Sequence, residues 1–171
     1  MRPLHIIYST VSSKTKAYCF IAVFIIFLLF FISPDSYTHD LFNRSDSAIF
    51  FMCGKAWMNG MIPYVDFTDS KGPLLWLIYG IGYFISNYDY IGVFWLSCAM
   101  YVGVFTYIFK TVNIFLNDER LSLFNVLLMS LWLFNPWYHY EIKAEDWCQL
   151  FIILSIYRMS LHLYSHTKTS D

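Results

Sequence analysis

The sequence predicts an all-α, multi-pass integral membrane protein with about four transmembrane helices and two juxtamembrane helices in its first outer loop. Of the 171 residues, 58% are hydrophobic and 13% are charged, about half the charged share of an ordinary soluble domain. Several apolar runs approach the roughly 20 residues that a helix needs to cross a bilayer. Aromatic residues make up 22% of the chain, and Trp and Tyr favour the boundary between lipid and water. Residues 1–171 are therefore interpreted as one module in the cell membrane.

Charge and cysteine usage exclude two classes of function. The net charge is -1 and Lys and Arg are not clustered, so no nucleic acid is expected as a partner. The cysteines stand singly, without the spacing of a zinc site, and are interpreted as small apolar side chains: Cys19, Cys53, Cys98 and Cys148. A Cys53–Cys148 disulfide is the alternative if both residues face an oxidising compartment.

The first predicted span covers residues 17–33. Arg2, Lys14 and Lys16 precede it, which resembles the start of a signal peptide. No small-x-small cleavage site follows the apolar run, and the run is nearly long enough to span a bilayer. We therefore predict an uncleaved helix with its basic N-terminus in the cytoplasm.

The segment Pro73–Ile85 decides between four spans and five. At about 1.5 Å per residue it reaches some 20 Å, short of the roughly 30 Å hydrocarbon core, and it contains Gly80 and Gly82. If it lies flat on the outer surface, the basic residues of the later loops fall on the cytoplasmic side, as the positive-inside rule requires. We therefore predict spans near residues 17–33, 90–109, 121–137 and 147–164, outer loops at 34–89 and 138–146, and both termini in the cytoplasm.

The first outer loop is predicted to hold two helices joined by an acidic connector. Ser45 or Asp46 opens the first helix and Gly60 ends it as a C-cap. Its apolar positions follow a helical period: Ile49, Met52, Cys53, Ala56 and Trp57. Pro73 suits the first turn of the second helix. The outer tryptophans are interpreted as interface anchors: Trp57, Trp137 and Trp147.

Three groups of acidic residues are predicted to face the outer compartment. They are Asp46 at a helix start, Asp66 and Asp69 beside Lys71 in the connector, and Glu141, Glu145 and Asp146 before the last span. A carboxylate there can act as a general base, or can hold a cation that neutralises a phosphate. Each group also has a structural explanation: Asp46 as an N-cap, the connector as a solvated turn with local ion pairs, and the last group as complements to a helix dipole.

The stretch Asp46–Phe84 resembles the first outer loop of GT-C superfamily glycosyltransferases that use polyprenyl-phosphate sugars. The branch it resembles is family 39-like, related to protein O-mannosyltransferases and lipid A aminoarabinose transferases. The matching residues are Asp46, Gly54, Gly60, Ile62 to Tyr64, Asp66, Asp69, Lys71 and Pro73 to Leu75. A second match, to a T-E-E-W-x-x-x-F segment that opens the fourth span, consists of Glu145, Asp146, Trp147 and Phe151.

The resemblance implies an inverting glycosyltransferase. Asp46 would be the catalytic base, and the sugar would pass from a lipid-linked donor to an acceptor on the outer face. Lys71 would contact the carrier phosphate, Asp66 and Asp69 would border the substrate site, and Glu145 or Asp146 would bind the acceptor or a divalent cation. The resemblance does not specify a metal.

The length of the chain differs from the pattern of the family, whose members have several hundred residues and more spans. The resemblance therefore covers the N-terminal portion only. A truncated product or half of a split enzyme is expected, with a second polypeptide supplying further transmembrane helices. The alternative is a non-catalytic membrane subunit or remnant that binds a partner or a lipid-linked sugar.

Overall fold

The computed structural model describes residues 4–33, 35–37, 45–87, 89–133 and 144–169. Within these ranges the chain forms six α-helices and no strand, which confirms the all-α prediction. Two of the helices are long and apolar enough to cross a membrane, Lys14–Ile32 within α1 and Ile91–Leu116 of α4. The helices are α1 Leu4–Ile32, α2 Ser45–Met58, α3 Pro73–Ile85, α4 Ile91–Leu116, α5 Glu119–Leu133 and α6 Ala144–Thr169.

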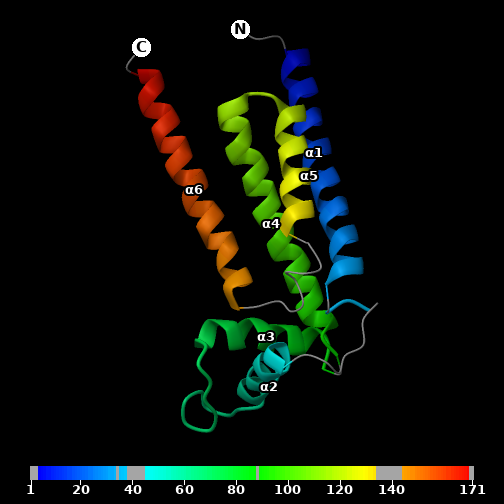
Figure 1. Ribbon diagram of the computed structural model, residues 1–171, viewed down its shortest axis with the longest axis vertical. Coiled ribbons are helices and arrows are strands. Elements are labelled where there is room, and N and C mark those ends of the chain that lie inside the picture. Colours follow the sequence, from blue (N-terminus) through cyan, green and yellow to red (C-terminus); the bar gives the residue numbers. More distant parts are fainter. Residues whose placement is uncertain (1–3, 34, 38–44, 88, 134–143, 170–171) are drawn as a thin grey trace.

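The helices divide into a bundle and a base. Figure 1 shows α1, α4, α5 and α6 extending along one axis, while α2 and α3 lie across one end of them. The two termini lie at the opposite end, together with the turn between α4 and α5. Helix α4 is central, since it contacts α1, α3, α5 and α6.

The core of the bundle forms around α4. Phe94, Tyr101 and Phe105 are each at most 1% exposed, and they meet the buried stripe Ile21, Ile25 and Leu29 of α1. A four-residue spacing places that stripe on one helix face. The opposite faces of the outer helices carry large exposed apolar side chains, including Phe20, Val23, Phe27 and Phe31 of α1, Phe124, Leu128 and Trp132 of α5, and Phe151, Ile152 and Met159 of α6. Surfaces of this kind normally contact lipid or a partner.

Glycines allow α3 to pack closely against α2 and α4 beneath the bundle. A Cβ on Gly54 of α2 would lie 2.5 Å from the Gly80 nitrogen, and a Cβ on Gly82 would lie 2.7 Å from a Val93 methyl of α4. Only glycine permits helix backbones to approach this closely. Gly80 and Gly82, which the sequence analysis identified as marks of a weak span, thus lie where α3 closely approaches α2 and α4.

The ends of α2 and α3 agree with the sequence. Helix α2 closes with paired bonds in which the Gly60 amide donates to the Trp57 carbonyl (3.0 Å) and the Met61 amide to the Ala56 carbonyl (3.1 Å). Gly60 has φ +91°, so it is the predicted C-cap glycine. Helix α3 has the predicted bounds, with Pro73 in its first turn.

The packing face of α2 differs from the prediction. Ile49 and Met52 are exposed, and the helix buries Ser47, Phe50 and Phe51 instead, with Cys53 shared by both faces. The helix is apolar nearly all the way round, so periodicity alone does not select a face. The close approach of Gly54 to Gly80 selects it, and the rings of Phe50 and Phe51 then contact Tyr79 and Tyr83.

The second long helix continues past its predicted end at residue 109. Helix α4 includes Lys110 and ends at Leu116, where Asn117 takes a left-handed conformation with φ 49°. Asp118 then accepts hydrogen bonds from the amides of Arg120 (2.8 Å) and Leu121 (3.1 Å) at the start of α5. The turn between the two helices is therefore only Asn117 and Asp118. The predicted end of the third span and most of the loop 138–146 lie outside the described residues.

Candidate functional site

An ion pair joins the acidic connector to the start of α6. The Lys71 Nζ lies 3.3 Å from the Glu145 Oε1, although the two residues are 74 positions apart in sequence. Their side chains are 35% and 71% exposed, so solvent screens the pair and it contributes little to stability. Its importance is positional, because it brings together residues from both segments that the sequence proposed for the site.

A cavity of about 220 Å³ lies beside this ion pair, between α3 and α6. Its walls are mostly apolar and come from Leu74, Leu75 and Ile78 on one side and from Trp147 and Phe151 on the other. Lys71 is the charged residue of its lining. In Figure 1, α6 begins close above α3, which is where these walls face each other. The arrangement suits a ligand with a long apolar part and one anionic group.

Asp66 is held by its own turn. The Ile62 amide donates to the Asp66 Oδ2 (2.7 Å), and the Asp66 amide donates to the Ile62 carbonyl (2.9 Å). Tyr64, inside this turn, has φ 65°, and its amide donates to the Phe67 carbonyl (2.8 Å). The local explanation of Asp66 as a turn residue accounts for these bonds, and a role in substrate binding stays a prediction.

Asp69 lies in the same connector but is directed towards α2. Burial raises the pKa of the Cys53 thiol, and the nearby Asp69 carboxylate raises it further, which places the two side chains near each other. The Asp69 Oδ2 is buried, and no described group forms a hydrogen bond with it. The role of Asp69 at the border of a substrate site stays a prediction.

Asp46 and Asp146 have different surroundings. Asp46 is exposed in the first turn of α2, where a negative charge complements the helix dipole, and no contact among the described residues joins it to Lys71 or Glu145. Asp146 is only 8% exposed and accepts a hydrogen bond from the Gln149 Nε2 (3.0 Å). It also interacts with the Tyr101 hydroxyl, which helps to hold α6 against α4.

A buried polar cluster next to the cavity was not predicted. Asp35, which follows α1, is 1% exposed, and its carboxylate interacts electrostatically with Tyr79 of α3. Burial raises the pKa of Tyr79, and the Asp35 carboxylate raises it further, while the neighbouring Ser47 and Trp147 side chains act on this pKa in the opposite direction. The one sequence signal was an acidic residue soon after an apolar run. Trp147 was interpreted from the sequence as an interface anchor. It is only 9% exposed and is instead part of this cluster and of the cavity wall.

Metal ligands and disulfides can be judged for the described part of the chain. There, no three His, Cys, Asp or Glu side chains come together in a group that could hold a metal ion. All four cysteines are free thiols, Cys53 and Cys98 buried and Cys19 and Cys148 exposed, so the alternative Cys53–Cys148 disulfide is not formed. Two of the residues singled out in the sequence, Trp137 and Glu141, lie outside the described residues.

The structure thus brings together Lys71, Glu145 and Trp147 around one cavity, with Asp69 in the same connector and Asp46 on a separate exposed turn. Compared with protein-family models, with curated proteins and with solved structures, the chain shows no significant match to any of them.

Proposed function

We propose that this chain is a membrane-embedded module that transfers a sugar from a polyprenyl-phosphate carrier to an acceptor on the outer face of the cell membrane. The observation that supports it most is the Lys71–Glu145 pair at the mouth of an apolar cavity. A polyprenyl phosphate has the matching chemistry, since its anionic phosphate suits a lysine ammonium and its isoprenoid chain suits apolar walls.

The membrane placement that we propose has four spans, α1, α4, α5 and α6, with α2 and α3 on the outer surface. It is supported by the apolar side chains exposed on the outer faces of α1, α5 and α6. The orientation puts both termini and the α4–α5 turn in the cytoplasm, together with Lys14, Lys16 and Arg120. The cavity and the acidic residues of the first loop then share the outer side.

In the proposed reaction, the acceptor oxygen attacks the anomeric carbon of the sugar with inversion. The bond from that carbon to the carrier phosphate breaks, and its electron pair leaves with the phosphate, which Lys71 stabilises. Asp46 takes the proton of the acceptor, and Glu145 orients the acceptor or a divalent cation. Because Asp46 is not in contact with Lys71 or Glu145, a donor or a second polypeptide would have to bridge the two parts of the site.

The lack of contact between Asp46 and the Lys71–Glu145 pair favours one alternative function. A non-catalytic subunit would bind the lipid-linked sugar in the cavity and pass it to a partner that supplies the further transmembrane helices. It would need Lys71 and the apolar walls, and it would not need Asp46 as a base.

Transfer assays on paired variants distinguish the two functions. The full chain in nanodiscs is given a labelled polyprenyl-phosphate sugar, with and without a detergent extract of the source membranes. Asp46→Asn should lower transfer about a hundredfold or more, the usual range for loss of a general base. Asp89→Asn is the control, because Asp89 lies in the same outer loop and accepts a hydrogen bond from the Ile91 amide at the start of α4 (3.1 Å). Donor binding that survives Asp46→Asn, with equal transfer by that variant and the parent, would eliminate Asp46 as base.

A further inference from the structure

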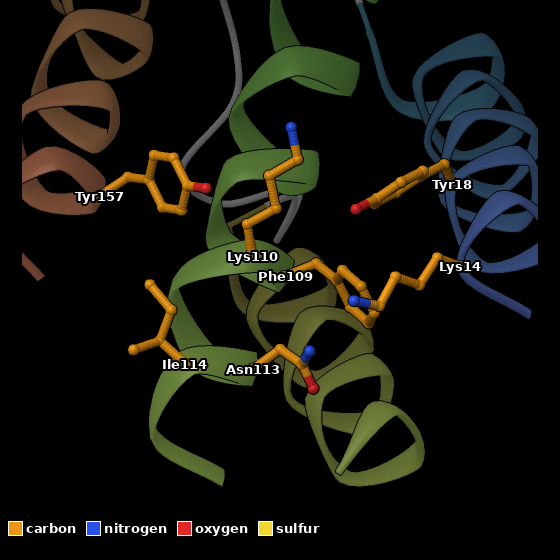
Figure 2. Close-up of a pocket in the computed structure, with 7 residues that line it drawn as sticks. All are labelled: Lys14, Tyr18, Phe109, Lys110, Asn113, Ile114 and Tyr157. Carbon is orange, nitrogen blue, oxygen red and sulfur yellow. The ribbon is translucent and has the colours of Figure 1, made fainter. Parts of the chain in front are cut away.

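A second cavity, also of about 220 Å³, lies towards the other end of the bundle, and cations and hydroxyls line it. Lys14 and Tyr18 come from α1, Lys110 and Asn113 from α4, and Tyr157 from α6 (Figure 2). Lys110 is six residues before the end of α4, about 9 Å along the helix, and that end lies beside both termini (Figure 1).

The polar groups of this cavity converge. In Figure 2 the hydroxyls of Tyr18 and Tyr157 point from opposite sides towards the space around Lys110, and the ammonium of Lys14 points into it from α1. Aromatic rings position the Lys110 ammonium, which lies 4.5 Å from the centre of the Tyr107 ring and 5.6 Å from that of Tyr18. Cation–π contacts of this kind hold a lysine without neutralising its charge.

The cavity therefore concentrates positive charge. Among the described residues, no carboxylate lies within ion-pair distance of Lys14 or Lys110. Glu119, at the start of α5, acts electrostatically on Tyr18 but is not part of the cavity lining. Two positive charges in the same cavity repel each other, and an anion bound between them offsets this repulsion.

An alternative explanation is that Lys110 only extends its side chain towards water, but this explains less of the cavity lining than anion binding does. A lysine near the end of a transmembrane helix commonly extends its side chain to the membrane surface. That behaviour accounts for Lys110 alone. It does not account for a lysine from α1, two tyrosine hydroxyls and an asparagine amide lining the same cavity, all of which can donate hydrogen bonds to an oxyanion.

We propose that this cavity binds the phosphate of an anionic phospholipid headgroup. Lys14 and Lys110 would contact the phosphate oxygens, and Tyr18, Tyr157 and Asn113 would donate to the remaining oxygens. Basic pockets between transmembrane helices on the cytoplasmic side are suited to such headgroups. A volume of about 220 Å³ exceeds the roughly 30 Å³ per water molecule several-fold, which leaves room for the phosphate and its ester substituents.

Lipid binding to the full chain tests the proposal without any sugar transfer. The protein, purified in a neutral detergent, is titrated with fluorescent phosphatidylglycerol and separately with fluorescent phosphatidylcholine. Lys14→Gln and Lys110→Gln should each weaken phosphatidylglycerol binding about tenfold, the loss expected for one charge-assisted hydrogen bond. Lys16→Gln is the matched control, since Lys16 is exposed on the same helix but does not line the cavity.

Further variants separate recognition from bulk charge and from misfolding. Tyr157→Phe removes one donor and keeps the charge, so it should weaken binding less than either lysine variant. Glu119→Gln should leave binding intact or strengthen it, because it removes a negative charge next to the site. Helix content by circular dichroism checks that each variant is folded.

Several results would overturn the proposal. Equal binding of phosphatidylcholine and phosphatidylglycerol would exclude recognition of the anionic headgroup. If Lys16→Gln and Lys14→Gln weakened phosphatidylglycerol binding equally, the lipid would be attracted by the overall positive charge of this region and not by a defined site. Binding of inorganic phosphate without binding of phosphatidylglycerol would make a free anion the ligand. A failed transfer assay would leave all of these results unaffected, because the first cavity lies at the opposite end of the bundle.

Discussion

Individual carboxylates in the connector have separable roles, and Asp66 is the clearest case. Its side chain accepts a 2.7 Å hydrogen bond from the Ile62 amide within a turn that also holds Tyr64 at positive φ. Asp66→Ala should lower the free energy of unfolding by about 1 kcal/mol, the usual net value of one such bond. Asp66→Asn keeps an acceptor oxygen, so its free energy of unfolding should fall by less. Urea unfolding of both variants in detergent measures this, and equal losses would mean that the negative charge, not the bond, matters.

Cys53 reports on the charge of Asp69. Only the thiolate reacts with maleimide, and both burial and the Asp69 carboxylate raise the pKa of this thiol. Asp69→Asn removes the negative charge, so the Cys53 pKa falls and the thiolate fraction at a given pH rises. Mass spectrometry should show faster alkylation of Cys53 at about pH 8, below the ordinary thiol pKa. Cys148, which is exposed on α6, is the internal control, and an unchanged Cys53 rate would place Asp69 elsewhere.

The crossing of α2 and α3 depends on two glycines. In Gly54→Ala the new methyl would meet the backbone of α3 at 2.5 Å, so the helices must separate and lose part of the core that contains Phe50 and Tyr79. A loss of about 1–3 kcal/mol in the free energy of unfolding is expected for this overpacking. Gly72→Ala is the control, because nothing lies within 4 Å of its added Cβ and its φ is −83°. Equal stabilities of the two variants would contradict the close crossing.

Much of the helix architecture could be predicted from the sequence. Local signals sufficed for α3, where Pro73 begins the helix, and for the end of α2, where Gly60 adopts positive φ. The buried face of α2 could not be predicted, because its apolar residues surround the axis and a contact with Gly80 selects the face. The end of α4 was missed because polar residues near a helix end do not by themselves stop it.

The candidate site was predictable only in its parts. Lys71 and Glu145 were each identified from their local sequence, but no local pattern reports that they meet across 74 residues. The cluster of Asp35 and Tyr79 was missed for the same reason, since its members are far apart in the sequence and its burial is a property of the assembled base. Long-range contacts of this kind are set by packing, which the sequence pattern does not encode directly.

For the molecule as a whole, cysteine labelling tests which parts of the chain lie on each side of the membrane. In a variant whose four native cysteines are replaced by serine, Asn117→Cys lies in the α4–α5 turn and Thr68→Cys lies in the connector, and both positions are exposed. On intact cells, a membrane-impermeant maleimide should label position 68 only, and position 117 should react only after permeabilisation. Labelling of position 117 from outside would contradict the proposed arrangement of four spans.

The most direct test of the central claim is to map where the donor binds. A polyprenyl phosphate that carries a photoreactive diazirine on its first isoprene units is crosslinked to the full chain in nanodiscs, and the adducts are located by mass spectrometry. The predicted adducts fall on Leu74, Leu75, Ile78, Trp147 or Phe151, with yield reduced about tenfold by Lys71→Gln and unchanged by Lys55→Gln, whose lysine faces Tyr83. Adducts elsewhere on the chain, or equal yields from the two lysine variants, would contradict it.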